Sequence, residues 1–393
     1  MLLESVLHED ERVQKTCMSL AEADFEVHVI FPAATVEVLF NYHDVYLYPF
    51  ISSKYLLKKL YATCLIQPFY FMFWAFLVRK YIADLHSFSI IYAHDLPLVK
   101  PAYLLKKKYG LKLVSDQHEY FTEFIQHTPR MLSLTGKVLG FISRWDAYEK
   151  KYLKEADLVV TVFAALQKRY TQRIPEIKDK MVVLPNSPLR NYYQARDRNI
   201  KIAEKYINEK AFRAIFVGAV ITRERRLDLM IDAIPKIIKR IPNFRFMILG
   251  SLHSSYDLMG HVQRLGIESH VEFIGRVPNF DIPDYLHCAV IGINVHDTDV
   301  GQVVHETFFT KFYQYLGMHN AIITTELKAM ASLVRQYDIG RVVESDPDSI
   351  ADAVVELLSD SEVLNTCIRN IENITDIFWE DTSVEWVEKM KNL

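Results

Sequence analysis

Short apolar runs alternate with longer amphipathic stretches along most of the chain. The runs are rich in Val, Ile, Leu and Phe and end at turn residues, which is the pattern of buried strands. In the first half, such runs predict strands at Glu26–Pro32, Ile90–Asp95, Lys112–Asp116, Asp157–Phe163 and Met181–Asn186. In the second half, they predict strands at Arg213–Gly218, Phe244–Gly250, Val271–Gly275, Val290–Val295, Ala321–Thr324 and Arg341–Glu344.

The stretches between these runs have the period of helices. In Leu227–Arg240 the apolar residues recur every three or four positions and form one stripe. A first helix is predicted to start at Asp10. Strands separated by helices imply right-handed crossovers and parallel sheets. Two such sets predict an α/β chain of two doubly wound, Rossmann-like domains that face each other across a cleft, where ligands of such sheets are expected.

The division between the two domains is predicted after Asn186. A Pro-Asn-Ser-Pro sequence there breaks the regular pattern, and the polar stretch that follows contains no strand pattern. We therefore expect a first domain over 1–190, a second over 205–375, and a C-terminal helix within 376–393 that packs back toward the first. No clear strand run precedes the first helix, so the first strand is either abbreviated to Met1–Val6 or the chain is cut short.

Composition agrees with two globular domains. Half of the 393 residues are hydrophobic, enough for a core in each domain. The amino terminus has acidic residues where a signal peptide has a basic start and an apolar run, so export is not expected. Four cysteines without CxxC spacing predict neither a disulfide framework nor a zinc site, and they fit a reducing cytoplasm: Cys17, Cys64, Cys288 and Cys367.

Charge is uneven along the chain. Residues 1–190 hold 24 Lys and Arg against 20 Asp and Glu, and the remainder holds 22 against 29. Segment 51–80 holds five basic residues and no acidic one around the aromatic run Phe69–Val78, which is shorter than the roughly 20 residues that span a bilayer. We favour an interfacial helix on an anionic membrane over a buried helix with lysines at its edge. The basic residues show no stripe typical of nucleic-acid binding.

The segment His305–Thr325 carries candidate chemistry. Glu306 and Gln314 stand eight residues apart around Lys311, on a predicted helix that leads into a strand. A carboxylate before a helix can hold sugar hydroxyls, the N–H groups at the helix start can face a phosphate, and a polar group two turns along can reach a ribose. The spacing therefore suits a nucleotide-sugar, although an ordinary surface loop and helix have the same pattern.

Several segments, taken in order, carry a resemblance to a known family. DERVQKTCMSLAEADFEVHVI resembles the family's opening helix and second strand, and IIYAHDLP and LVSDQHEYF resemble its acceptor-side loops. ADLVVTV, VVLPNSP, FVGAVITRERRLDLMIDAI and FRFMILG follow in the family's order, and TKFYQYLGMHNAIIT resembles K-x-x-E-Y followed by G-x-P-V-I. Over nearly its whole length, the chain resembles the GT-B glycosyltransferases of group 1, or family 4. These are retaining enzymes with nucleotide-sugar donors.

The resemblance implies roles in the donor site. Arg225 and Lys311 are expected to contact the donor diphosphate near Gly218, and Glu306 is expected to hold hydroxyls of the donor sugar. Gln314 stands where the family has a Glu that binds the ribose. Because bonds to charged groups are worth about 1.5–3 kcal/mol and neutral ones about 0.5–1.5 kcal/mol, this change should weaken binding by about 1–2 kcal/mol.

Other departures from the family pattern surround the same site. His319 stands in place of the Gly that ends the helix, and Ala321 in place of the Pro that opens the next strand. Ala219 replaces an Arg that many members have, and Arg226 replaces a Gly.

In the first domain, four polar residues follow two predicted strands and are expected at the cleft rim: His94, Asp95, His118 and Glu119. His94 is a candidate catalytic residue, and the other three are acceptor-side candidates. A histidine here can contact the donor sugar or the acceptor, and a carboxylate can orient the acceptor hydroxyl. No protein base is assigned, because in retaining enzymes of this kind the leaving diphosphate is thought to take the acceptor's proton. Retention is implied by the resemblance alone.

Two further motifs bear on metal binding and on a dinucleotide cofactor. Asp297-Thr298-Asp299 reads DxD, which binds a metal in GT-A glycosyltransferases, but in the GT-B pattern protein cations replace that metal, so no metal is expected. Gly218 is followed by no further glycine of a G-x-G-x-x-G fingerprint, which argues against a dinucleotide-dependent oxidoreductase.

The sequence thus predicts a cytoplasmic, peripheral-membrane glycosyltransferase without cofactor. It is expected to move a hexose or related sugar from a nucleotide-sugar to a glycan or lipid-linked acceptor in polysaccharide or glycoconjugate biosynthesis. The alternative is a GT-B pseudoenzyme, which acts as a binding or scaffold subunit of another transferase. A sugar-nucleotide epimerase on the same fold is a third possibility.

Overall fold

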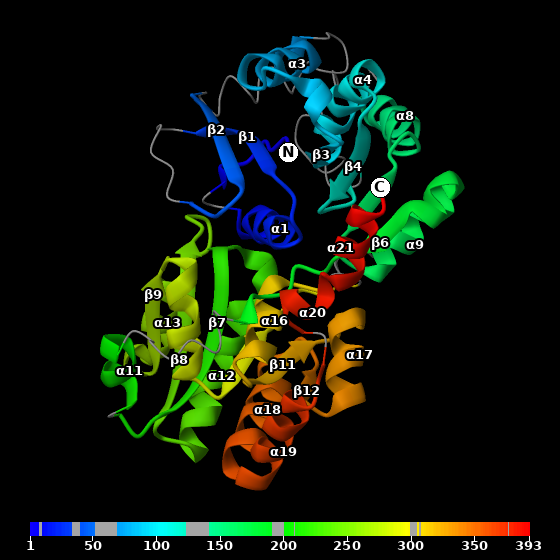
Figure 1. Cartoon of the computed structure of the whole chain (residues 1–393). Helices are drawn as coiled ribbons and strands as arrows, with labels where there is room; N and C mark the ends of the chain where they lie inside the picture. Colours follow the sequence, from blue (N-terminus) through cyan, green and yellow to red (C-terminus); the bar gives the residue numbers. More distant parts are fainter. Residues whose placement is uncertain are drawn as a thin grey trace. The chain divides into compact units, whose positions relative to one another are not determined.

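The computed structural model describes residues 1–7, 10–33, 40–51, 69–122, 141–190, 200–207, 209–298, 305, 308–375 and 377–393 (Figure 1). The chain forms two compact units. The first comprises Met1–Asn186 together with Thr382–Leu393, and the second comprises Ser187–Asp381. Each unit is an α/β structure built on parallel strands.

The first unit contains two parallel groups of strands that residue Leu2 connects. Leu2 forms parallel bridges to Ile30 on one side and to Ala93 on the other, and its N–H donates to the Tyr92 carbonyl at 2.8 Å. The predicted first strand is therefore present as a short pairing at the centre of the sheet. The strands run in the order β2 (Val45–Ile51), β1 (Val27–Ala33), Leu2, β3 (Ile90–His94), β4 (Lys112–Gln117), β5 (Leu158–Thr161) and β6 (Met181–Val183).

Asp10 and Trp386 position the first and the last helix of the first unit. Asp10 caps the first helix, where its carboxylate accepts a hydrogen bond from the Val13 N–H at 3.2 Å. The C-terminal helix contacts β6, and its buried Trp386 lies edge-on to Tyr92 in the same unit. The helices are α1 (Glu11–Glu22), α3 (Phe69–Tyr81), α4 (Val99–Tyr109), α8 (Phe141–Leu153), α9 (Ala164–Arg173) and α21 (Val384–Lys391).

Helix α3 has two apolar faces. Tyr70, Phe71, Trp74, Leu77 and Val78 are buried, whereas Phe69, Met72 and Phe76 are large apolar side chains on the exposed face. Among the described helices, none is both long and apolar enough to cross a membrane.

The second unit is a six-stranded parallel sheet in the doubly wound order. Its first strand, β7, lies at the centre, and the chain winds outward to β9 on one side and to β12 on the other, which is the order 3-2-1-4-5-6. The switch point lies between β7 and β10. The strands are β7 (Phe212–Ile221), β8 (Phe244–Leu252), β9 (Val271–Gly275), β10 (Ile291–Asn294), β11 (Ala321–Thr325) and β12 (Gly340–Val343).

Amphipathic helices cover this sheet. In α12 the stripe of Leu, Met and Ile side chains is buried, and this helix packs against α18. Asp346 and Asp360 cap the two helices α18 and α19. The helices are α11 (Ile200–Ile207), α12 (Leu227–Arg240), α13 (Leu258–Leu265), α14 (Ile282–His287), α16 (Thr310–Gly317), α17 (Lys328–Tyr337), α18 (Pro347–Ser359) and α19 (Ser361–Glu372), with α20 (Trp379–Thr382) at the division between the units.

The predicted strand runs all appear as strands, and α12 has the predicted bounds. β2 was not predicted from the sequence. Its run VYLYPFI is apolar, but Pro49 stands inside it, and a proline within such a run argues against a strand.

Candidate active site

Three segments meet at the switch point of the second unit. The first begins in β7, whose pairing with β8 is irregular between Val217 and Val220. It continues into a short 3₁₀ turn, Arg223–Arg225. The second follows β10 and contains His296, and the third is the start of α16 with Lys311. Parallel strands present their carboxyl ends at one edge, so the topology itself brings these segments together.

A glycine is required on β8 where it passes the end of β7. At Gly250 a Cβ atom would lie 2.0 Å from the carbonyl oxygen of Gly218, and φ there is +134°. A Cβ on Gly218 would meet only side chains, the nearest being that of Phe216 at 2.9 Å. The backbone at the start of the loop that carries Arg225 therefore lies directly against Gly250.

Arg225 and Lys311 lie over the same aromatic ring. The Arg225 guanidinium is 4.9 Å from the centroid of Phe309, and the Lys311 ammonium is 5.2 Å from that centroid and 4.4 Å from the centroid of Phe216. Lys311 is only 6% exposed, and Arg225 Nη1 is buried without a hydrogen-bond partner. Within the described part of the chain, neither cation has an ion pair with a carboxylate. A buried lysine beside a half-buried arginine, with no ion pair to a carboxylate among the described residues, forms a site for an anion.

The electrostatics of this cluster agree with that interpretation. Burial, and then the positive charge of Arg225, lower the pKa of Lys311 well below its usual value. His296 stacks on Phe309 at 5.4 Å, and burial lowers its pKa to about 4, so it is neutral at physiological pH. A bound anion would relieve the destabilisation of the charged lysine.

Tyr315 fixes the position of α16. Its hydroxyl accepts a hydrogen bond from the Val217 N–H at 3.2 Å and donates one to the Ile293 carbonyl at 2.9 Å. The helix is therefore tied to both central strands, β7 and β10. Gln314, one turn after Lys311, is 8% exposed, and its side-chain amide has no partner among the described residues.

Two departures from the family pattern have left-handed backbones. Arg226 has φ +44° and His319 has φ +57°, at positions where the family has glycine. A side chain in this conformation costs roughly 1–2 kcal/mol. Arg226 borders a polar pocket of about 350 Å³, lined also by Arg223, Glu224, Asp228 and Asp297. Glu306 and Asp299 lie outside the described residues.

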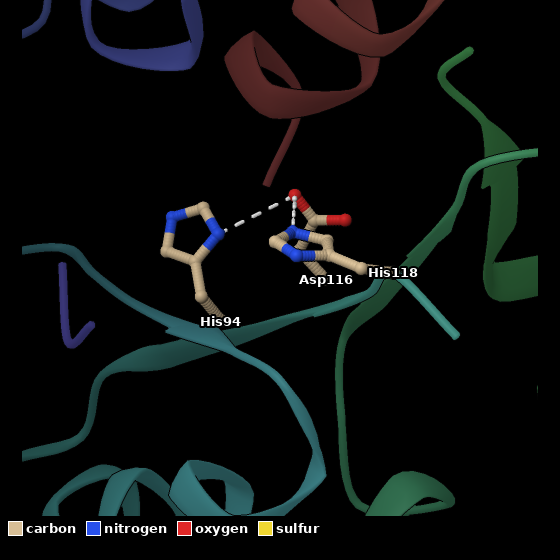
Figure 2. Close-up of side chains that lie close together, drawn as sticks. All are labelled: His94, Asp116 and His118. Carbon is tan, nitrogen blue, oxygen red and sulfur yellow. Dashed lines mark ion pairs between the residues drawn. The ribbon is translucent and has the colours of Figure 1, made fainter. Parts of the chain in front are cut away.

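The carboxyl ends of β3 and β4 in the first unit gather a second polar cluster. His94 ends β3 and is fully buried, and His118 follows β4. Figure 2 shows both imidazoles pointing toward the carboxylate of Asp116, with His94 Nδ1 and His118 Nε2 each 3.5 Å from Asp116 Oδ2. The other ring nitrogen of His118 lies 3.5 Å from Asp95 Oδ1. The buried guanidinium of Arg12 donates to both oxygens of Asp116, at 3.0 and 3.3 Å.

The two histidines of this cluster have opposite charge states. Although burial lowers the pKa of His118, the carboxylates of Asp95 and Asp116 outweigh burial and raise it to about 9. Burial lowers the pKa of His94 to about 3. Burial raises the pKa of Asp116, but Arg12 and His118 outweigh burial and hold it below its usual range. His118 is thus a cation and His94 a neutral ring at physiological pH.

The structure brings the predicted residues together in two groups. Gly218, Arg225, Lys311 and Gln314 belong to the switch point of the second unit. His94, Asp95 and His118 lie at the carboxyl ends of β3 and β4 in the first unit, with Glu119 exposed beside them. Sequence reasoning missed three residues of these groups, Arg12, Asp116 and His296. His296 directly follows a buried strand, which was a usable signal.

Two family descriptions match the chain. "Glycosyltransferase Family 4" matches residues 12–187, and "Glycosyl transferases group 1" matches residues 211–360. The chain is also 23% identical over 150 residues to a phosphatidyl-myo-inositol mannosyltransferase of Mycobacterium tuberculosis. That match covers 37% of this chain and spans 37% of the length of the relative.

Solved structures share the fold over the whole chain. HepE from Anabaena in complex with UDP is 15% identical, with a TM-score of 0.71 over 100% of this chain and 99% of HepE, and another HepE structure holds UDP-glucose. Sucrose-phosphate synthase from Thermosynechococcus elongatus is 13% identical, with a TM-score of 0.69 over 97% of this chain and 92% of the synthase. These likenesses show the two-domain GT-B fold.

Proposed function

Because the chain belongs to the group 1, family 4 glycosyltransferases of GT-B fold, we propose that it transfers a sugar from a nucleotide-diphosphate sugar to a glycan or lipid-linked acceptor. The observation that carries the proposal is the pair Arg225 and Lys311 at the switch point of the second unit, a half-buried and a buried cation that form no ion pair with a carboxylate among the described residues. The HepE complexes with UDP and UDP-glucose support a donor of this class.

The reaction breaks the bond between the anomeric carbon of the sugar and an oxygen of the diphosphate. The electron pair stays on that oxygen, so negative charge grows on the leaving group. Arg225 and Lys311 would stabilise this charge, Arg225 with its planar fork and Lys311 as a point charge. Their burial strengthens the interaction, because little water screens it. Gln314 would contact the ribose, and Glu306 the hydroxyls of the donor sugar.

On the acceptor side, the proposal uses His94, Asp95, His118 and Glu119. A cationic His118 cannot accept a proton, so it would donate a hydrogen bond to a substrate oxygen. Asp95 would orient the acceptor hydroxyl, and the neutral His94 would contact the donor sugar or acceptor. The leaving diphosphate, and no protein base, would take the acceptor's proton, with retention of configuration at the transferred sugar.

We further propose that the acceptor lies at an anionic membrane surface, for synthesis of a cell-surface polysaccharide or glycoconjugate on the cytoplasmic side. The exposed face of α3 supports this proposal: Phe69, Met72 and Phe76 are each more than half exposed, and Arg79 and Lys80 continue the exposed face. Apolar side chains beside basic ones suit the interface of an anionic bilayer. The name of the mycobacterial mannosyltransferase also supports a lipid acceptor. Lys54, Lys58 and Lys59 of the same predicted segment lie outside the described residues.

Vesicle sedimentation tests the membrane proposal. Met72→Ser with Phe76→Ser should reduce binding to vesicles that contain anionic lipid, while Met259→Ser should not. Met259 is a control because it is 54% exposed, against 60% for Met72 and 57% for Phe76, but lies on α13 of the second unit. Equal sedimentation of the double variant and the parent protein would refute the proposal.

A thermal-shift panel of nucleotide-diphosphate sugars and bare nucleotides, followed by assays of nucleotide release, tests the transferase proposal. Stabilisation by one donor together with turnover would support an enzyme. Stabilisation without turnover would support the pseudoenzyme alternative, which Gln314 and the left-handed His319 and Arg226 favour. No stabilisation by any nucleotide would contradict both readings of the donor site.

A further inference from the structure

His296 is a side chain of the candidate donor site that the proposed reaction does not use. It follows β10 by two residues and is only 6% exposed. Its ring stacks on that of Phe309, with centroids 5.4 Å apart and planes 19° apart. Arg225 and Lys311 lie over the same phenylalanine ring, at 4.9 and 5.2 Å from its centroid. His296 therefore borders the position that we propose for the donor diphosphate.

Backbone hydrogen bonds fix the position of His296. Its N–H donates to the Thr325 hydroxyl at 3.0 Å, and that hydroxyl donates to the His296 carbonyl, also at 3.0 Å. The next residue, Asp297, donates its N–H to the Glu224 carbonyl at 2.9 Å. Thr325 ends β11, and Glu224 precedes Arg225 in the 3₁₀ turn. The histidine is thus held between the sheet and the loop that carries Arg225.

The hydrogen bond of Nδ1 sets the tautomer of the His296 ring. Nδ1 lies 3.1 Å from the backbone carbonyl oxygen of Asp297, and because a carbonyl oxygen only accepts, Nδ1 carries the hydrogen. Burial lowers the pKa of His296 to about 4, so the ring is neutral at physiological pH and Nε2 has a lone pair. Among the described residues Nε2 has no hydrogen-bond partner, and it is not one of the side-chain atoms buried without one, so it is accessible.

A lone pair on Nε2 restricts the groups that can bind there. The oxygens of an ionised diphosphate carry no hydrogen and cannot donate to it, whereas a hydroxyl can. Hydroxyls stand on both sides of the donor diphosphate, on the ribose and on the transferred sugar. The proposed reaction assigns the ribose to Gln314, which leaves the transferred sugar for His296.

We propose that His296 binds the transferred sugar of the donor, by accepting a hydrogen bond from one of its hydroxyls at Nε2. This inference rests on the proposed function, because it requires a nucleotide-sugar at the switch point of the second unit. It adds a donor-binding residue that distinguishes a nucleotide-sugar from the bare nucleoside diphosphate.

Substitutions at position 296 separate hydrogen bonding from packing. His296→Phe keeps a ring on Phe309 but removes the acceptor, whereas His296→Gln retains an acceptor oxygen close to the position of Nε2. Titration calorimetry on the full chain measures two pairs of probes, UDP-glucose with UDP and GDP-mannose with GDP. For each pair that the parent binds, His296→Phe should weaken binding of the nucleotide-sugar about three- to tenfold and leave binding of the nucleoside diphosphate unchanged. His296→Gln should keep the affinity of the parent for both.

A second variant and a control keep the test decisive. His296→Leu, which also lacks the acceptor but is smaller, should show the same selective loss and replaces His296→Phe if melting curves show that the latter does not fold. His287→Phe should change neither affinity, since His287 is exposed and precedes β10 instead of following it.

The outcomes distinguish this inference from the proposed function on which it rests. If folded His296→Phe or His296→Leu binds the nucleotide-sugar as tightly as the parent, or loses the nucleoside diphosphate equally, the inference is overturned and the proposed function stands. If the parent binds none of the four probes, the proposed donor class and the inference both fail.

Discussion

Lys311→Met separates what the buried lysine does for stability from what it does for binding. Methionine keeps an unbranched apolar stem on the rings of Phe216 and Phe309 but removes the charge. In the free protein Lys311 is only 6% exposed, and its charge has no carboxylate partner in the described part of the chain. The variant should therefore be more stable than the parent and bind the donor less tightly.

The magnitudes follow from this environment. An unpaired buried charge destabilises the folded protein by several kcal/mol. The two contacts of the Lys311 ammonium with aromatic rings offset about 2 kcal/mol of this cost. The lowered pKa of Lys311 limits the remaining cost, because the amine can become neutral instead. We expect a gain of about 1–3 kcal/mol in the free energy of unfolding of the second unit. For a unit of this size, each kcal/mol raises the melting temperature by about 2–4 °C.

Donor binding should change in the opposite direction. A hydrogen bond to a charged group is worth about 1.5–3 kcal/mol, so loss of the ammonium should weaken nucleoside-diphosphate binding about 10- to 150-fold. Isothermal titration with the tightest-binding nucleoside diphosphate of the panel measures the affinity, and differential scanning calorimetry measures stability. Lys239→Met, an exposed lysine on α12, is the control and should change neither quantity. Unchanged affinity, or a loss of stability, in Lys311→Met would refute the reasoning.

Three further predictions concern Gln314, Lys311 and His118. Gln314→Glu should tighten nucleotide binding about tenfold by restoring a charged acceptor to the ribose, and weaker binding in titration calorimetry would argue against the ribose role. Because the pKa of Lys311 is lowered in the free protein and a diphosphate favours its charged form, binding should take up protons and weaken as pH rises. Lys311→Met should flatten this pH dependence, and an equally steep profile would exclude Lys311 as its source. The His118 pKa is raised from 6.5 to about 9, so its stabilising contribution is full below pH 6.5 and is lost as pH rises through 9. In chelator-containing buffer, the stability deficit of His118→Gln in urea unfolding should therefore shrink over that range, and a constant deficit would contradict the charged state of His118.

The strands of the buried sheets could be predicted because burial on both faces makes them continuous apolar runs. β2 was not predicted, because its position beside β1, rather than its own sequence, makes it a strand. Its register pairs Pro49 with Phe31 and leaves several side chains half-exposed. The proline inside its run therefore hid this strand from local pattern, whereas β6, β9 and β12 were predicted although they also lie at sheet edges.

The candidate site was predictable to a different degree in each unit. In the second unit, Arg225 and Lys311 came from a resemblance in local motifs, and the fold brings them onto one phenylalanine ring. In the first unit, Asp116 reads as part of a buried strand, and its partner Arg12 is 104 residues away. A contact over that separation depends on the sheet topology, so no local pattern could have revealed it.

The preference for a diphosphate over a monophosphate tests the central claim most directly. Affinities for the nucleoside diphosphate and for its monophosphate are measured by titration calorimetry in the parent and in Arg225→Ala and Lys311→Ala. If Arg225 and Lys311 hold the second phosphate, the parent should prefer the diphosphate by at least about tenfold, and each variant should lose most of that preference. An undiminished preference in both variants would contradict the account and place the diphosphate elsewhere.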